Sequence, residues 1–254
     1  KYLSQIEKLC SRIILCKRAE KPWQPINILK AVFGWHPFLV VRNFSEEAQQ
    51  VVKKLLAEEQ FDVIHAETFY VMPHLPETKT PVLLVEQTIE FQVYLHFVES
   101  LPFLIRPFFL LDIFKLTYWE RYYWRKASLV STVSLADLRK IHDLEPHTNL
   151  SVVPNGAGED MMTIPLVSRN LQKPILLFVG HFSWLQNSEA AEILWNDIFP
   201  FVKKNLPGVE LIIAGQKARE KLRLPHQSNA HIIDLDPDDK DTVRKLYQEA
   251  TLLI

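Results

Sequence analysis

The sequence is poor in cysteine. Its 254 residues include two, Cys10 and Cys16. Two cysteines are too few for a disulfide framework, and their spacing is not the C-x-x-C of a redox pair or a structural metal site. A small secreted scaffold held by disulfides is therefore excluded. We expect a reducing compartment, and so a cytoplasmic protein.

An excess of either charge is also lacking. The 29 Lys and Arg residues against 30 Asp and Glu residues give a formal net charge of −1. This balance excludes a polybasic nucleic-acid binder and an acidic tail protein, and we expect no nucleic-acid partner. The content of 48% hydrophobic and 23% charged residues is that of a globular protein. At about 150 residues per domain, the length predicts one large or two modest domains.

A long apolar run is the third feature that is missing. A membrane-spanning helix needs about 18 apolar residues in a row, and the sequence has no such run. The nearest, residues 101–114, is interrupted by Arg106, Asp112 and two prolines. Such a segment spans a bilayer poorly but can lie on one, or in a core. Its cluster of Phe and Leu leads us to expect a peripheral contact with the inner face of a membrane.

Short runs of Val, Leu and Ile alternate with helical patterns along the chain. The predicted strands are residues 12–16, 61–64, 81–85, 129–133, 151–153, 175–180, 211–215, 231–233 and 251–254. The runs are continuous, which is what strands buried on both faces of a parallel sheet require. The sequence therefore predicts an α/β protein with two Rossmann-like, doubly wound domains.

Helices are predicted between these strands. Ser45 is the expected N-cap of a helix with an acidic first turn and one apolar stripe. Residues 112–127 are rich in aromatic side chains and have the period of a helix laid on the sheet. Residues 188–204 form another predicted helix, which Pro200 kinks or divides.

The periodicity lapses between the two halves of the chain, where Pro, Ser and Asn are frequent. We expect residues 1–160 to form an N-terminal domain, residues 161–173 an interdomain linker, and residues 174–254 a C-terminal domain. The chain starts without a methionine and stops inside the apolar run 251–254. We therefore expect a fragment in which both domains are incomplete.

The turn after the predicted strand 175–180 has the layout of an anion site. Gly180 permits close approach of a ligand to the backbone. A helix entered near Asn187 offers free N–H groups and about half a positive charge to a phosphate. Gly215, at the end of the next strand, is a second such place. An ordinary turn with a helix cap has the same layout. A phosphate site and a purely structural turn therefore both stay open at this point.

Several sequence segments resemble segments of one enzyme family and occur in the same order along the chain. They are LLFVGHFSWLQNSEAAEILWNDIFPFVKKNLPGVELIIAG, VVPNGAGED before it, and FDVIHAE and VLLVEQTIE earlier. In these runs the chain resembles the group 1 glycosyltransferases, family 4, which have the two-domain GT-B fold. It is similar in particular to the branch with a G-x-x-x-W-x-x-N pattern, formed here by Gly180, Trp184 and Asn187.

The resemblance implies a hexosyltransferase that moves a sugar from a nucleotide sugar to a glycan, a lipid-linked or another hydroxyl acceptor, with retention at the anomeric carbon. It implies no cofactor and no bound divalent metal. The N-terminal domain would hold the acceptor, and the C-terminal domain the nucleotide diphosphate. Basic side chains and helix N-termini would neutralise the leaving phosphate. Two family segments fall outside the sequence, so we expect the chain to be inactive as it stands.

Candidate site residues follow from the same resemblance. Gln87 stands where members commonly have a histidine facing the sugar, with Glu90 nearby; glutamine can hydrogen-bond a hydroxyl but cannot transfer a proton. His65, with Glu67, is the remaining candidate on the acceptor side, and it rests on position alone, because it follows the predicted strand 61–64 at the end that should face the ligand. His181 stands where members often have an arginine that binds the diphosphate. The expected donor-binding residues are Gly180, His181, Trp184, Asn187, Gly215 and Gln216.

Two other classes of protein fit parts of the sequence. Asp234 and Asp236 form a D-x-D after a predicted strand, the pattern with which glycosyltransferases of the other large fold, GT-A, hold a metal and a diphosphate. The acidic run Asp236, Asp238 and Asp239 also directly precedes a predicted helix, whose N-terminus favours acidic caps. A non-catalytic solute-binding protein also joins two α/β domains by a linker, and it is the second alternative.

Overall fold

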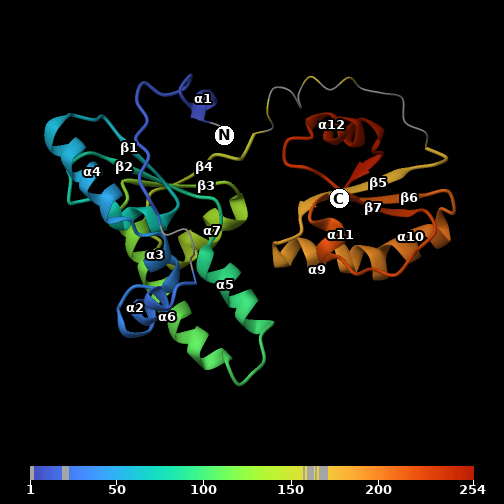
Figure 1. Cartoon of the computed structure of the whole chain (residues 1–254), viewed down its shortest axis with the longest axis horizontal. Helices are drawn as coiled ribbons and strands as arrows, with labels where there is room; N and C mark the ends of the chain where they lie inside the picture. The colour runs from blue at the N-terminus through green and yellow to red at the C-terminus, as the bar shows by residue number, and fades with distance from the viewer. Residues whose placement is uncertain (1–2, 19–22, 157, 159–162, 164, 166–170) are drawn as a thin grey trace. The chain divides into compact units, whose positions relative to one another are not determined.

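The chain packs as two units. The computed structural model describes residues 3–18, 23–156, 158, 163, 165 and 171–254. Unit 1 is Lys1–Asn155 and unit 2 is Gly156–Ile254; Figure 1 draws unit 1 in blue to yellow-green and unit 2 in yellow to red. Most of the predicted linker, residues 161–173, lies outside the described residues.

Unit 1 is built on a four-stranded parallel sheet in the order β1-β2-β3-β4. The strands are β1 Ile64–Glu67, β2 Val82–Glu86, β3 Leu129–Thr132 and β4 Leu150–Val152. All four are predicted from the sequence to within a few residues. The first is displaced toward the C-terminus, so that His65 and Glu67 lie within β1 and not after it.

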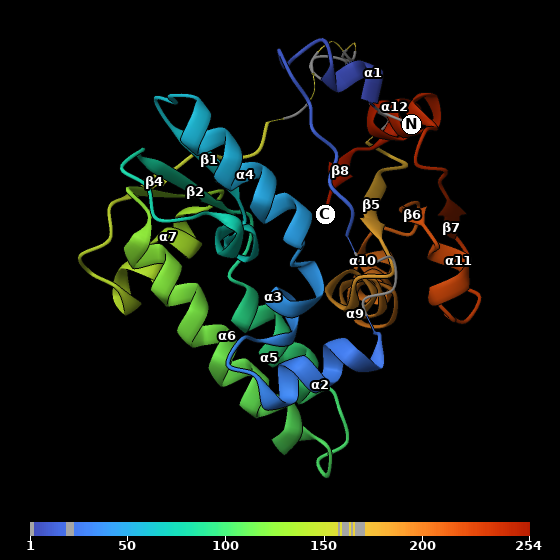
Figure 2. The ribbon, with the colours of Figure 1, turned by 60° about the vertical axis from the view of Figure 1, so that its left-hand side comes forward.

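Unit 1 also contains seven described α-helices and one 3-10 helix. They are α1 Leu3–Ile6, α2 Pro25–Phe33, α3 Phe38–Asn43, α4 Glu46–Glu58, the 3-10 helix η1 Phe69–His74, α5 Glu90–Glu99, α6 Arg106–Lys126 and α7 Leu135–Leu144. Ser45 caps α4 as predicted, because its hydroxyl accepts the N–H of Ala48 at 3.2 Å. Figures 1 and 2 show α5 and α6 running side by side away from the sheet. The core includes Phe69, Leu84, Leu116, Trp124 and Ile141, all fully buried.

The predicted strand at residues 12–16 is wrong. This segment is irregular and lies beside the C-terminal end of α4, where Arg12 donates to Glu59 at 2.8 and 3.0 Å. Leu15 is 71% exposed, so the apolar run is not part of the core. A strand needs a neighbour with which to pair its backbone, and a short apolar run cannot reveal whether one exists.

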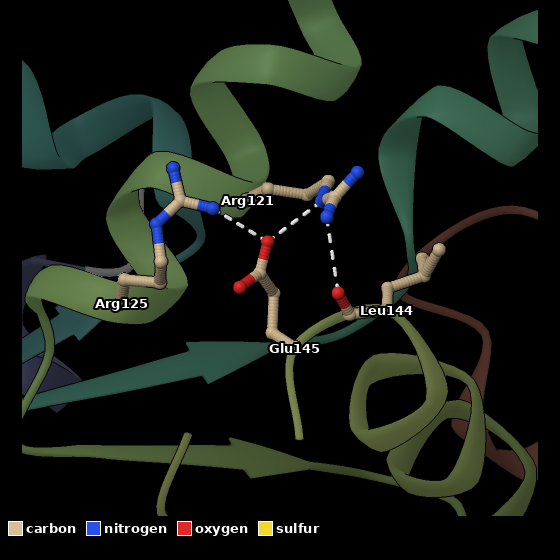
Figure 3. Close-up of polar contacts among 4 residues, drawn as sticks. All are labelled: Arg121, Arg125, Leu144 and Glu145. Atoms are coloured by element: carbon tan, nitrogen blue, oxygen red, sulfur yellow. Dashed lines mark hydrogen bonds and ion pairs between the residues drawn. The ribbon is translucent and has the colours of Figure 1, made fainter. Parts of the chain in front are cut away.

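An ion cluster joins the end of α6 to the end of α7 (Figure 3). The carboxylate of Glu145 accepts from Arg121 at 2.7 Å and also from Arg125. Arg121 donates in addition to the carbonyl oxygen of Leu144, at 3.0 Å. The Glu145 side chain is 12% exposed, so the cluster holds a largely desolvated carboxylate between two cations.

Replacing Glu145 with alanine is expected to lower the free energy of unfolding by about 2 kcal/mol, because it leaves two guanidinium groups without their shared acceptor. Chemical denaturation measures the change. The control is Glu59→Ala, which breaks the exposed pair with Arg12 and is expected to cost at most about 0.5 kcal/mol. Equal losses from the two variants would contradict the prediction.

Unit 2 is a second parallel sheet, in the order β7-β6-β5-β8. Its strands are β5 Ile175–His181, β6 Glu210–Gln216, β7 Ala230–Asp234 and β8 Leu252–Leu253. Alternate residues of β6 enter different cores: Leu211 and Ile213 pack on one face, and Ile212 and Ala214 on the other. A continuous apolar strand is thereby buried on both faces.

Helices cover both faces of this second sheet. In Figure 1, α12 (Lys240–Glu249) lies on one face, and α9 (Leu185–Ile193), α10 (Phe199–Asn205) and the short α11 (Ala218–Lys221) lie on the other. The predicted strands, including the last one, are confirmed. With its two parallel sheets, the protein is a mixed α/β molecule of Rossmann-like units, as the sequence predicts.

The predicted helix over residues 188–204 is divided, as Pro200 indicates. A π-helical turn, η2 (Leu194–Ile198), separates α9 from α10, and Pro200 lies in the first turn of α10. Proline has no N–H to donate to the preceding turn. The break therefore falls just before it, where the N–H of Phe199 reaches the carbonyl oxygen of Leu194.

Candidate functional site

Two glycines face each other near the carboxyl ends of β5 and β6. Gly180 pairs with Gly215, and His181 pairs with Gln216 one residue later. Gly215 has a φ of +154°, and a Cβ atom placed on it would lie 1.7 Å from the carbonyl oxygen of Gly180. Only glycine fits there. The two glycines that the sequence predicts thus leave the backbone near the carboxyl ends of β5 and β6 without side chains.

The loop from β5 to α9 is braced by the residues of the G-x-x-x-W-x-x-N pattern. The amide of Asn187 donates to the carbonyl oxygen of His181 at 3.1 Å, and the N–H of Trp184 donates to the same oxygen at 3.1 Å. A Cβ atom on Gly180 would lie 3.2 Å from the Asn187 side chain. Gly180 and Asn187 therefore hold the shape of the loop, while the side chain of Trp184 is 61% exposed.

His181 is oriented by this loop. Its Nδ1 accepts the N–H of Ser183 at 3.2 Å. In the neutral ring the proton then resides on Nε2, which can donate to an anion. The helix α9 begins at Leu185, and its N-cap residue, Trp184, offers no side-chain hydrogen bond to the helix. The positive end of the helix dipole is thus also available to an anion beside His181.

A cation that the sequence analysis missed follows β6 directly. Lys217 is exposed and has a φ of +58°, in the left-handed region. It comes immediately after Gln216, which faces His181 across the two strands. Nothing in the sequence singles out this lysine among many others, because its place next to the partner of His181 depends on the pairing of β5 with β6.

The aspartates at the end of β7 and after it bind the local backbone. A carboxylate oxygen of Asp234 accepts the N–H of Arg219 at 3.0 Å, and one of Asp236 accepts the N–H of Asp238 at 3.1 Å. Asp239 caps α12, because it accepts the N–H of Thr242 at 3.0 Å. The capping interpretation of this acidic run is confirmed. In the part of the chain that the structure describes, no group of three or more His, Cys, Asp or Glu side chains is arranged to hold a metal ion.

In unit 1, the sequence-predicted His65 and Gln87 belong to one polar network at the carboxyl ends of the strands. Glu67 joins them: one of its oxygens lies 3.1 Å from Nε2 of His65, and the other accepts from the Gln87 amide at 2.6 Å. The oxygen of Gln87 accepts in turn from Asn155, at 3.0 Å. These side chains are exposed. Asn155 was not predicted as a member, since it is 68 residues from Gln87 along the chain.

Glu90 does not share this environment. It is half-buried at the start of α5, and burial raises the pKa of its carboxyl group, an effect that the charge of Arg42 opposes. The N–H groups of Glu90 and Phe91 donate to the buried carboxylate of Glu120, at 2.8 and 3.0 Å. Of the three predicted catalytic residues, the structure therefore brings together His65 and Gln87 and puts Glu90 in a separate acidic group.

That acidic group contains two fully buried glutamates that the sequence analysis did not single out. Glu86, the last residue of β2, accepts from the indole N–H of Trp124 at 2.9 Å. Burial, and secondly the charge of Glu120, raise the pKa of Glu86 well above its usual range. Burial also raises the pKa of Glu120, to about 8. Two such carboxyl groups cannot both ionise readily at neutral pH.

A cavity of about 700 Å³ lies in unit 1 among α2, α3 and the N-terminus of α4. Its walls include Lys17, Lys30, His36, Gln49 and Tyr123. Pro73 of η1 also lines it. Burial lowers the pKa of His36, and its buried Nδ1 atom has no hydrogen-bond partner among the described residues. The volume suits a small molecule or one or two sugar rings.

Comparisons with known proteins give no family for this chain. No protein-family profile matches it, and no curated protein matches it. Among solved structures, it is similar to the crystal structure of accessory secretory protein 1, 2 and 3 in Streptococcus pneumoniae, at 15% sequence identity and a TM-score of 0.39. The match covers 81% of this chain and 38% of that chain. This chain therefore spans well under half the length of the protein that it matches.

Proposed function

We propose that the protein is a retaining glycosyltransferase of the GT-B type, in which unit 2 binds a nucleotide sugar and unit 1 binds the acceptor. One observation carries the proposal: His181, the N-terminus of α9 and the glycine pair Gly180 and Gly215 all lie around one end of the second sheet. Open parallel sheets bind their ligands beyond the carboxyl ends of the strands.

The chemistry of sugar transfer matches these groups. Breaking the bond between the sugar and the diphosphate builds negative charge on a phosphate oxygen, which must be neutralised. Nε2 of His181 and the backbone N–H groups at the start of α9 would donate to the diphosphate, and Lys217 would add a positive charge. Gln216 and Gly215 would lie beside the rest of the nucleotide. None of these roles needs a metal ion.

The acceptor would bind to unit 1. Glu67 and Gln87 offer a carboxylate and an amide to sugar hydroxyls, and His65 lies within hydrogen-bond distance of Glu67. The bond from C1 of the transferred sugar to the diphosphate breaks, and an acceptor hydroxyl forms its bond to C1 on the same face, so that the configuration is retained; the hydroxyl proton passes to the departing phosphate oxygen. A polar group near C1 must support the positive charge that develops there. A glycan or a lipid-linked sugar in the cytoplasm is the class of acceptor that we propose.

Titration with UDP, GDP and ADP tests the donor site without requiring transfer. We expect one of the three to bind unit 2, and His181→Ala to weaken its binding by about tenfold, the value of one hydrogen bond to a charged group. Isothermal calorimetry measures the affinity. The matched control is His226→Ala, an exposed histidine of the same unit. Absence of binding by all three nucleotides, or equal effects of the two substitutions, would count against the donor site.

A further inference from the structure

Unit 1 exposes an apolar face at the free end of the helical hairpin formed by α5 and α6. Its most exposed members are Phe33 at the end of α2 and Phe103, Leu104, Phe108, Leu111 and Phe114 around the start of α6; each is more than 60% exposed. Figures 1 and 2 show this end of the hairpin projecting away from the sheet, with α2 alongside α6. Exposed apolar surface of this extent commonly marks an interaction site.

Contacts between α2 and α6 make this face continuous. The ammonium group of Lys115 donates to the carbonyl oxygens of Ala31 and Gly34 at the end of α2, at 2.7 and 2.8 Å. The rings of Trp35 and Tyr118 meet edge to face, with their centroids 5.6 Å apart. The apolar face therefore includes the end of α2 and the first half of α6, which are about 80 residues apart in the sequence.

The charged side chains within residues 100–118 are bonded to nearby backbone. Arg106 donates to the carbonyl oxygens of Leu101 and Glu99, at 2.8 and 2.6 Å. Asp112 accepts the N–H of Phe38 at 2.9 Å, and burial raises the pKa of its carboxyl group. Together with Lys115, these are all the Asp, Glu, Lys and Arg residues of the segment. Moving this face out of water consequently costs less than moving free charges would.

The residual charge of the same region is positive. Residues 23–36 and 99–118 contain Lys30, Arg106 and Lys115 against Glu99 and Asp112, a balance of 3 − 2 = +1, whereas the whole chain has a net charge of −1. Basic residues beside apolar side chains are attracted to anionic lipid headgroups, by about 1 kcal/mol each. The region also holds Trp23 and Trp35, and tryptophan favours the membrane–water boundary.

We propose that this apolar face docks on the surface of a bilayer that contains anionic phospholipids. Among the described helices, none has the length and hydropathy to cross a membrane, so the face would lie at the interface, as amphipathic helices do. The helix α2 contributes both to this face, through Phe33, and to the cavity of unit 1, through Asn27 and Lys30. Docking would bring a lipid-linked molecule close to that cavity.

Flotation with lipid vesicles tests the proposal on the intact chain. We expect the protein to float with vesicles of phosphatidylcholine and phosphatidylglycerol (3:1), and less with phosphatidylcholine alone. The double variant Phe108→Ser/Phe114→Ser should bind the anionic vesicles at least about tenfold more weakly, because two exposed aromatic anchors are lost. The matched control is Phe201→Ser in α10, which removes a phenylalanine that is 71% exposed and should float as the wild type does.

Circular dichroism verifies that each variant is folded, as expected for exposed positions. Failure of the wild type to float, or equal flotation of the double variant, would overturn the proposal. Equal flotation with both kinds of vesicle would overturn the role of anionic lipid. A dimer that the double variant dissociates, without vesicle binding, would assign the face to a second copy of the chain instead. The assay uses no nucleotide sugar, so its outcome is independent of the transfer reaction.

Discussion

Replacing Gly215 with alanine is expected to lower the free energy of unfolding of unit 2 by at least about 3 kcal/mol, or to prevent its folding. The new Cβ atom would lie 1.7 Å from the carbonyl oxygen of Gly180, which is backbone and cannot rotate away. The φ of +154° adds strain for any residue with a side chain. Relief would require β5 and β6 to separate, and the two strands form the centre of the sheet.

Chemical denaturation, followed by circular dichroism, measures this effect. Gly156→Ala is the matched control, because a Cβ atom there would meet no other atom within 4 Å, and its stability should change by no more than about 0.5 kcal/mol. A Gly215→Ala variant that is within about 1 kcal/mol of the wild type would show that the strands tolerate the insertion. If Gly215→Ala also retained nucleotide binding, the nucleotide site would not require a residue without a side chain at the end of β6.

The second large effect concerns the two buried glutamates of unit 1. We expect unit 1 to lose stability as the pH rises from about 4.5 through about 8, because burial raises the pKa of Glu120 from 4.5 to about 8, and that of Glu86 well above 4.5. Across this range the folded state holds protons that the unfolded state has released. Each such proton lowers the free energy of unfolding by up to about 1.4 kcal/mol per pH unit.

Glu86→Gln isolates this contribution. The amide oxygen can still accept from the indole of Trp124, but the side chain no longer ionises. We expect the stability of the variant relative to the wild type to rise as the pH increases from about 4.5 to about 8, because only the wild type must keep a proton on residue 86 when it folds. Urea denaturation across the pH range measures the difference, and Glu58→Gln, at an exposed position in α4, is the control. A difference that is constant with pH would contradict the assignment.

Local pattern was sufficient to predict most secondary structure. Continuous apolar runs identified eight strands, the Ser45 cap located α4, and Pro200 located the division of the helix after β5. These features depend on the chemistry of adjacent residues, which is present in the sequence itself. The segment 12–16 was predicted wrongly because its apolar run has the composition of a strand but lies against a helix end instead of a neighbouring strand.

The candidate sites were predicted only in part. Gly180 and Gly215 were identified from their places at strand ends, yet the reason that Gly215 must be glycine is the carbonyl oxygen of Gly180, 35 residues earlier in the sequence. Lys217 joins the same edge by strand pairing, and Asn155 joins Gln87 across unit 1. No pattern of adjacent residues carries that information.

The sequence by itself determined that the chain forms two parallel sheets of α/β type, because burial on both faces requires continuous apolar strands. Tertiary structure alone decided that Glu90 joins a buried acidic group with Glu86 and Glu120, and that Phe33 shares one apolar face with Phe114. The physical reason is that the pKa of a carboxyl group and the exposure of a side chain depend on neighbours in space, and those neighbours are distant along the chain.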